Sequence, residues 1–371
     1  MKTHRSFRFR FCRPICLAVL WVGLPRIAAA DSPTGPACES EVFGRLPDQR
    51  EVRRFSLDNG AGLRVQVMEY GATITGIFVP DRNRRVTNVV LGSDRFEDYL
   101  AGRVPAASVI GRFANRIAGA RFTLDGTTYT LAANSGTNHI HGGPQGFAKR
   151  LWQGEALPRS EDGVVGVRFT YRSADGEEGY PGNLVVSVSL LLTPRGELQL
   201  QYAASTDRPT VVNLTNHAYF NLAGGGDVMN HELWLAAEQY TPTDASLIPT
   251  GATATVVGTP LDFLETTRLG ARMDRLPPPY TGYDHNFVLG DPTPRPRLVA
   301  RLRDPAGGRT MEVLTTEPGV QLYTGNHVQH RGVCLETQHY PDSPNQPAFP
   351  SCVVRPGAPF ESETVFRFKV R

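Results

Sequence analysis

The sequence predicts an all-β protein built as one large antiparallel β-sandwich. Segments that alternate between apolar and polar residues recur along most of the chain, whereas the periodicity of helices is weak. The 371 residues include 37 glycines and 29 prolines, which suit the turns between short strands better than helix interiors. Hydrophobic residues make up 40% and charged residues 20%, a composition that allows a large core and disfavours general disorder.

Alternating segments follow one another from about Val52 to the C-terminus. The strongest hairpin signal is residues 121–130, where Asp125-Gly126 is a pair typical of a type I′ turn. Only residues 95–100 and 267–272 are expected to make a turn or two of helix. Further strands are expected at residues 63–67, 165–171, 184–190, 197–202, 297–302, 311–315 and 364–370.

The first thirty residues are typical of a signal peptide. A basic stretch is followed by an apolar run over residues 15–24, and Ala28 and Ala30 give a small-residue cleavage pattern before Asp31. The apolar run is shorter than the roughly twenty residues that span a bilayer. We therefore expect a signal peptide at residues 1–30 and a periplasmic or secreted protein with no membrane segment in its mature form.

Behind that leader, two further segments are expected. Residues 31–50 are polar and contain prolines, which predicts a loose N-terminal lead-in. Residues 51–371 contain no segment with the composition of a linker and no repeat of fixed length. They are therefore expected to form a single sandwich domain.

The net charge indicates which partners to expect, and the cysteine count limits the possible disulfides. Without the six basic residues of the leader, 33 Lys and Arg remain against 36 Asp and Glu. A slightly acidic body gives no reason to expect nucleic-acid binding, which needs a clustered basic face. Cys38, Cys334 and Cys352 remain and allow either one disulfide with one free thiol or no disulfide.

Polar residues that strands do not require gather in a few stretches. Together they supply His, Glu, Asp, Arg, Asn and Gln side chains, which can bridge neighbouring hydroxyl groups of a sugar. One acid and one base then suffice to open and reclose a sugar ring, without a metal, a redox cofactor or a nucleophile. The stretches are residues 111–117, 138–143, 213–222, 282–287, and 317–326 followed by 334–342.

Other chemistries have weaker support. His139 and His141 would share one face of a strand, as metal ligands could, but no H-E-x-x-H motif is present. The phosphate-loop and G-x-S-x-G motifs are also absent. Glu336 with a second carboxylate would suit glycoside hydrolysis, in which the two groups lie roughly 5–10 Å apart, and this alternative stays open. Taken singly, each polar residue is explained as readily by a structural role.

Seven segments, in the same order, resemble the aldose 1-epimerase family, also called galactose mutarotases. The resemblance covers roughly residues 50–371 and implies the family's large antiparallel β-sandwich, the galactose mutarotase-like supersandwich. It also implies an isomerase that interconverts the α and β anomers of free aldohexoses such as glucose and galactose. The segments are residues 111–118, 141–152, 213–222, 261–263, 282–287, 317–321 and 334–342.

The resemblance also assigns roles to single residues. It implies that His217 is the general acid that protonates the ring oxygen and that Glu336 is the general base on the anomeric hydroxyl. A free sugar is the expected partner of a monomer or homodimer, and neither a cofactor nor a metal is implied. The residues expected to bind the sugar are Asn115, Arg116, His141, Asp284 and Gln321.

Ordinary ionisation constants add an expectation about the acid and the base. A Glu with a pKa near ~4.3 is a ready base at neutral pH, so Glu336 is expected to act without adjustment. A His with a pKa near ~6.5 needs a neighbouring carboxylate or hydrogen bond to stay partly protonated, and this applies to His217.

Two related functions remain as rivals. A hexose-6-phosphate epimerase would need a basic cluster for the phosphate, and Arg112, Arg116 and Arg331 are the candidates. A non-catalytic sugar-binding protein could dispense with the acid–base pair. The stretch at residues 327–333 is shorter than the loop that relatives often carry, which leaves the rim of the site and the sugar preference open.

Overall fold

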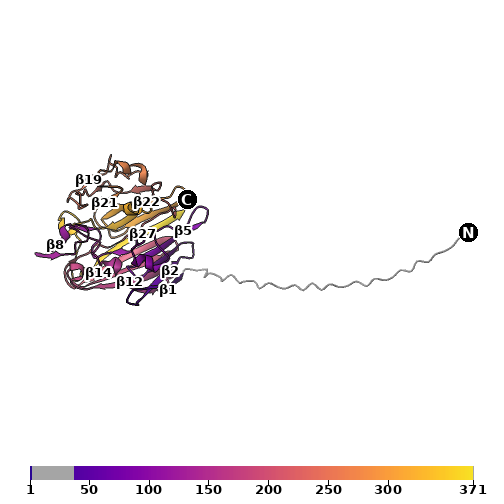
Figure 1. The fold of residues 1–371 in the computed structure, drawn as a ribbon, viewed down its shortest axis with the longest axis horizontal. Coiled ribbons are helices and arrows are strands. Elements are labelled where there is room, and N and C mark those ends of the chain that lie inside the picture. The colour runs from indigo at the N-terminus through magenta and orange to yellow at the C-terminus, as the bar shows by residue number, and fades with distance from the viewer. Residues whose placement is uncertain (2–36, 371) are drawn as a thin grey trace. The chain divides into compact units, whose positions relative to one another are not determined.

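The computed structural model describes Met1 and residues 37–370, and it confirms the predicted fold class. Strands dominate the body, and every ladder between two named strands within it is antiparallel (Figure 1). Apart from Met1, the signal peptide expected over residues 1–30 lies outside the described residues. Within the described part of the chain, no helix is long and apolar enough to cross a membrane.

The largest sheet has nine strands, and many of its side chains belong to the main apolar core. Its labelled strands β12, β14, β27 and β22 follow one another across Figure 1. Burial alternates strictly along β13, Leu184–Leu192, because successive side chains of a strand point to opposite faces. In spatial order the strands are β11 (Gln153–Leu157), β12 (Val165–Ser173), β13, β14 (Glu197–Thr206), β27 (Phe360–Val370), β23 (Arg309–Thr315), β22 (Arg297–Arg303), β17 (Glu232–Leu235) and β20 (Thr267–Arg268).

A five-stranded sheet covers one part of the nine-stranded sheet. The edge-to-face contact between Phe55 and Phe169, with ring centroids 5.7 Å apart, joins the two layers inside one continuous apolar core. This is the sandwich that the alternating pattern predicted. The strands, in spatial order, are β1 (Ala37–Arg45), β2 (Glu51–Asp58), β3 (Arg64–Met68), β4 (Thr73–Pro80) and β5 (Val86–Asn88).

Strand β1 differs from the sequence-based expectation. The whole strand falls in the stretch expected to be a loose lead-in, yet it pairs with β2 from Ala37 opposite Asp58 to Arg45 opposite Glu51. Its side chains are half-buried or exposed. An edge strand is held mainly by its backbone hydrogen bonds, so it does not need the apolar alternation that marks a buried strand.

A second five-stranded sheet and four short ladders complete the fold. The sheet consists of β19 (Ala254–Thr255), β18 (Gln239–Tyr240), β21 (Asp284–Val288), β24 (Gly319–Tyr323) and β25 (Cys334–Gln338), in this spatial order. The ladders pair β6 (Val109–Ile110) with β16 (Thr215–Asn216), β7 (Arg116–Ile117) with β10 (His139–Ile140), β8 (Arg121–Leu124) with β9 (Thr127–Thr130), and β15 (Thr210–Val211) with β26 (Val353–Val354).

The local predictions are largely confirmed. Strands β8 and β9 form the expected hairpin, and Asp125 and Gly126 both adopt the positive φ of a type I′ turn, 50° and 79°. The first expected helical segment is α1, Phe96–Leu100. The second begins as strand β20 and continues as a 3₁₀ turn. The 3₁₀ turns are η1 (Ala118–Ala120), η2 (Phe147–Lys149), η3 (Glu177–Gly179), η4 (Leu269–Ala271), η5 (Met273–Arg275), η6 (Asn326–Val328) and η7 (Ser343–Asn345).

Of the two options left open for the cysteines, the structure has the one without a disulfide. Cys38, Cys334 and Cys352 are all free thiols, and the last two are buried.

Candidate active site

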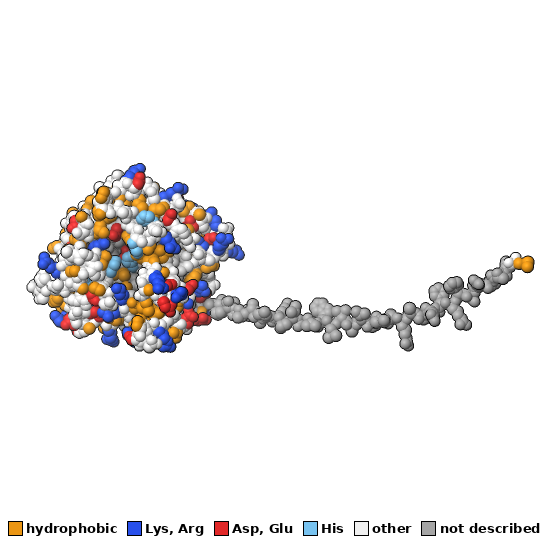
Figure 2. Space-filling view, viewed as in Figure 1, with side chains coloured by type: hydrophobic (Ala, Val, Ile, Leu, Met, Phe, Trp, Pro, Cys, Tyr) orange, Lys and Arg blue, Asp and Glu red, His pale blue; other side chains and the backbone are white. Residues whose placement is uncertain are grey.

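The residues predicted from the sequence converge on one hollow. Histidine side chains gather around it on the face shown in Figure 2. Six of the seven predicted residues line this cavity of about 220 Å³, and the seventh, Gln321, lies behind it, hydrogen-bonded to Asp284. The lining consists of Asn115, Arg116, Ile140, His141, His217, Tyr219, Asp284, Tyr323, His327 and Glu336.

The register of the second five-stranded sheet places much of this set. Asn286 of β21, Gln321 of β24 and Glu336 of β25 form one row across three strands. The next row towards the cavity rim brings Asp284 and Tyr323 into register. Because alternate residues of a strand share a face, the two rows present their polar side chains on the same side of the sheet.

His217 and Glu336 lie against each other at the base of the cavity. His217 follows the short strand β16, and its backbone N–H donates to the carbonyl oxygen of Ser108. Its Nε2 atom lies 3.7 Å from Oε1 of Glu336, whose side chain is only 2% exposed. The other carboxylate oxygen, Oε2, has no hydrogen-bond partner among the described residues. An acid–base pair therefore faces the cavity with unused bonding capacity.

Burial changes the ionisation of both groups. It raises the pKa of Glu336 well above its ordinary value, the nearby Asp284 raises it further, and Arg116 opposes these effects. It lowers the pKa of His217 to about 4. The expectation that Glu336 is a ready base with an ordinary pKa is thus wrong. Because burial disfavours charge on both groups, the neutral pair is favoured, with the proton on the Glu336 carboxyl.

A second polar group lies beside this pair. Gln321 donates from Nε2 to Oδ1 of Asp284 at 2.6 Å, and Arg116 Nη1 lies 3.8 Å from Oδ2 of the same carboxylate. Burial raises the pKa of Asp284, and both partners pull it back down. The Oε1 atom of Gln321 has no partner among the described residues. This group is therefore held in place and still has an acceptor free for a hydroxyl.

Asn115 and His141 hold each other in place where β7 begins and β10 ends. Both have a left-handed backbone, with φ of 60° and 54°. The N–H of Asn115 donates to His141 Nδ1 at 3.2 Å, and the N–H of His141 donates to the carbonyl oxygen of Asn115 at 3.0 Å. Burial, together with His217 and Arg116, holds the pKa of His141 well below its usual value, so its imidazole is neutral. Such backbone conformations cost free energy and persist where the surroundings enforce them.

Sequence reasoning missed the aromatic wall of the cavity. The ring of Tyr219 stacks on that of His217 with centroids 4.9 Å apart. Tyr323 OH lies 2.7 Å from His327 Nδ1, and the two rings stack. Tyr219 follows His217 by two residues and Tyr323 follows Gln321 by two, so period-two spacing could have identified both. His327 belongs to the short stretch at residues 327–333, where no such signal exists.

Two side chains considered for other chemistries point elsewhere. Arg112 is 1% exposed, and its guanidinium donates to carbonyl oxygens of Pro181 and Gly182 and to Ser173 Oγ. It is therefore engaged in holding loops and is not available to bind a phosphate. His139 contacts Tyr180 OH through Nε2 at 2.7 Å and does not line the cavity with His141.

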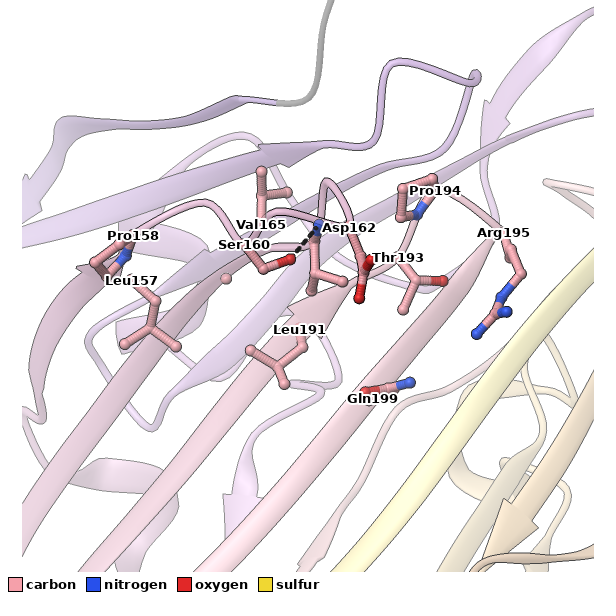
Figure 3. Close-up of a pocket in the computed structure, with 12 residues that line it drawn as sticks. Leu157, Pro158, Ser160, Asp162, Val165, Leu191, Thr193, Pro194, Arg195 and Gln199 are labelled. Carbon is pink, nitrogen blue, oxygen red and sulfur yellow. Dashed lines mark hydrogen bonds between the residues drawn. The ribbon is translucent and has the colours of Figure 1, made fainter.

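A larger hollow of about 710 Å³ lies elsewhere, beside the loop at residues 158–164 and the turn after β13 (Figure 3). Its two charged side chains, Asp162 and Arg195, are exposed, and the hydrogen bond drawn in it runs from the Val164 N–H to Ser160 Oγ at 3.0 Å. No ionisable pair lies buried in its wall. The smaller cavity is therefore the candidate active site.

Comparisons with known proteins agree with the fold. The family model described as aldose 1-epimerase matches residues 53–367. The chain is 44% identical to galactose mutarotase of Bos taurus over 89% of this chain and 98% of the relative. It is 36% identical to aldose 1-epimerase of Escherichia coli K12, over 89% and 99%.

Solved structures give the same result. The crystal structure of galactose 1-epimerase from Lactobacillus acidophilus superimposes with a TM-score of 0.79 at 27% identity, over 91% of this chain and 99% of that one. A GalM/aldose epimerase homologue from C. elegans gives a TM-score of 0.76 at 28% identity, over 85% and 98%. On the family match and the identity of these relatives, the chain belongs to the aldose 1-epimerase family.

Proposed function

We propose that the protein is an aldose 1-epimerase that interconverts the α and β anomers of free aldohexoses such as glucose and galactose. The observation that carries this proposal is the 3.7 Å approach of His217 Nε2 to Glu336 Oε1 inside the cavity. The ring oxygen and the anomeric oxygen of a pyranose are bonded to the same carbon. An acid and a base that act on these two oxygens must therefore lie side by side, as these two groups do.

The chemistry needs only proton transfers. His217 protonates the ring oxygen while Glu336 takes the proton of the anomeric hydroxyl, the bond between C1 and the ring oxygen breaks, and the open-chain aldehyde forms. Rotation about the C1–C2 bond turns the other face of the carbonyl towards the hydroxyl. On closure Glu336 returns its proton to the carbonyl oxygen and His217 recovers its own. The pair begins and ends each turnover with one proton.

The remaining predicted residues are proposed to hold the sugar. Arg116, Asp284 and Gln321 form a connected group on one side of the cavity, and such planar side chains bind neighbouring hydroxyls through paired hydrogen bonds. Asn115 and neutral His141 add polar atoms next to His217, whose ring centroid is 5.2 Å from that of His141. The engagement of Arg112 elsewhere supports a free sugar over a sugar phosphate.

We further propose that the chain is exported and works as a monomer or homodimer. The basic and apolar pattern of residues 1–30 and the Ala28-x-Ala30 sequence before Asp31 support export. Expression of the full chain in a Gram-negative host with secretion intact should yield a product whose N-terminal residue is Asp31. Recovery of uncleaved chain from the cytoplasm alone would contradict export.

Polarimetry tests the proposed reaction directly. Freshly dissolved α-D-glucose and α-D-galactose should relax to their equilibrium rotation much faster with the protein than in buffer. Glu336→Gln should lower kcat by about 10²–10⁴-fold, because it removes the base while keeping the size of the side chain. Circular dichroism and thermal unfolding should stay close to those of the wild type.

Glu155→Gln is the matched control, because Glu155 is an exposed glutamate of β11. It should leave kcat unchanged. Wild-type turnover by a folded Glu336→Gln protein would remove Glu336 from the role of base. A folded wild-type protein that does not accelerate the relaxation of either sugar would refute the proposed reaction.

Asp284→Ala tests the binding group. The substitution removes the acceptor of the Gln321 hydrogen bond and the partner of Arg116, so the sugar loses a held carboxylate in both the ground state and the transition state. KM should rise and kcat should fall. Steady-state polarimetry over a range of galactose concentrations separates the two effects, and no change in either constant would mean that Asp284 does not hold the sugar.

The pH dependence follows from the shifted ionisation of the pair. Activity requires one proton on the pair, and the second proton binds only near the lowered pKa of His217, about 4. The raised pKa of Glu336 keeps the first proton bound to higher pH. A plot of kcat/KM against pH should therefore fall on its acid side near pH 4 and on its alkaline side at a pH well above ~4.3, the ordinary pKa of Glu. An alkaline limb at or below that value would contradict a proton retained on the pair.

A further inference from the structure

The second ring nitrogen of His217 faces a buried thiol. Cys334 Sγ lies 3.5 Å from His217 Nδ1, within the range of a hydrogen bond to sulfur. Cys334 is 0% exposed and lies two residues before Glu336 on β25, so both side chains lie on the same face of the strand. Within residues 37–370, no other residue hydrogen-bonds to this nitrogen.

This contact bears on which nitrogen carries hydrogen. A neutral imidazole has one N–H, and its position is set by the partner of the other nitrogen. A sulfur that accepts from Nδ1–H leaves Nε2, the nitrogen that lies 3.7 Å from Glu336, free to take up a proton and pass it on. In the opposite tautomer Nε2 already carries the only hydrogen of the neutral ring, and loss of that hydrogen would leave an imidazolate anion.

A sulfur acceptor also suits a histidine that gains and loses a proton at Nε2 in each turnover. It accepts from Nδ1–H both in the neutral ring and in the protonated ring, so this contact persists while Nε2 loses and regains its proton. A carboxylate in the same place would strongly favour the charged ring. Burial raises the pKa of Cys334 well above its usual value, so the group stays a thiol and does not act as an anion.

We propose that Cys334 is a positioning residue for His217: its sulfur orients the imidazole and keeps a hydrogen on Nδ1, so that Nε2 can carry a proton to and from the ring oxygen of the sugar. The proposal rests on the proposed function of His217 as the acid. Cys334 itself does not line the cavity and is not expected to touch the sugar.

Kinetics of three variants test this role. Cys334→Ala should lower kcat about 10-fold or more, as the loss of a partner that orients a functional histidine does in metal sites, with KM nearly unchanged. Cys334→Ser should be more active than Cys334→Ala, because a hydroxyl also donates and accepts. Cys352→Ala is the matched control, since it removes the same buried Sγ, 4% exposed, from a separate apolar cluster. It should keep the wild-type kcat.

The tautomer itself can be observed. In the full chain labelled with ¹⁵N-histidine, two-bond ¹H–¹⁵N correlations, assigned with His217→Gln, should show hydrogen on Nδ1 of the neutral His217 ring in the wild type and in Cys352→Ala. Cys334→Ala should shift the ring towards the Nε2–H form and move the acid limb of the kcat/KM profile.

Three results would overturn the proposal. They are an Nε2–H tautomer in the wild type, an unchanged tautomer and kcat in Cys334→Ala, and equal losses of kcat in Cys334→Ala and Cys352→Ala, which would indicate packing alone. A wild-type protein that fails in polarimetry would refute the proposed function, whereas the tautomer measurement would still decide on the contact.

Discussion

The site depends on one contact between two ionisable side chains that are buried together. His217 and Glu336 approach to 3.7 Å in surroundings that raise the pKa of the acid and lower that of the imidazole. Burial penalises the charged form of each group, so the neutral pair, with the proton on Glu336, is favoured over the charged pair, with the proton on His217. On the proposed function, the proton passes to His217 when the sugar is bound, and the short distance between the two groups makes this transfer direct.

The fold supplies the precision that this contact needs. Glu336, Gln321 and Asp284 lie on neighbouring strands whose register is fixed by backbone hydrogen bonds, and a shift by one residue would turn all three to the opposite face. His217 comes from a different part of the chain and is tied by its backbone to Ser108. Groups on strands are held more rigidly than groups on loops. Where loops do contribute, at Asn115 and His141, reciprocal hydrogen bonds enforce a left-handed backbone.

Sequence reasoning predicted what depends on local pattern. Alternation identified the longer strands, and the Asp125-Gly126 pair identified the hairpin of β8 and β9. Strand β1 was missed because an exposed edge strand needs little apolar alternation. Seven site residues were named in advance because polar motifs and a family resemblance mark them, and six of them line the cavity. Neither a polar motif nor the family resemblance identified His327, which also lines the cavity. The ionisation of Glu336 could not be predicted, since it depends on burial and on Asp284, which is distant along the chain.

Two buried polar atoms at the site lack hydrogen-bond partners in the described part of the chain, and this lowers the stability of the fold while it leaves acceptors for a ligand. Glu336 Oε2 and Gln321 Oε1 are buried and unbonded among the described residues, and each such atom costs about 1–3 kcal/mol of folding free energy. An apolar residue at either position would remove that cost and also the acceptor. Of the two residues, Glu336 lines the cavity, so on the proposed function a sugar hydroxyl that bonds to its Oε2 recovers that part of the free energy on binding. The protein tolerates this loss because the large core between its sheets stabilises the fold independently of the site.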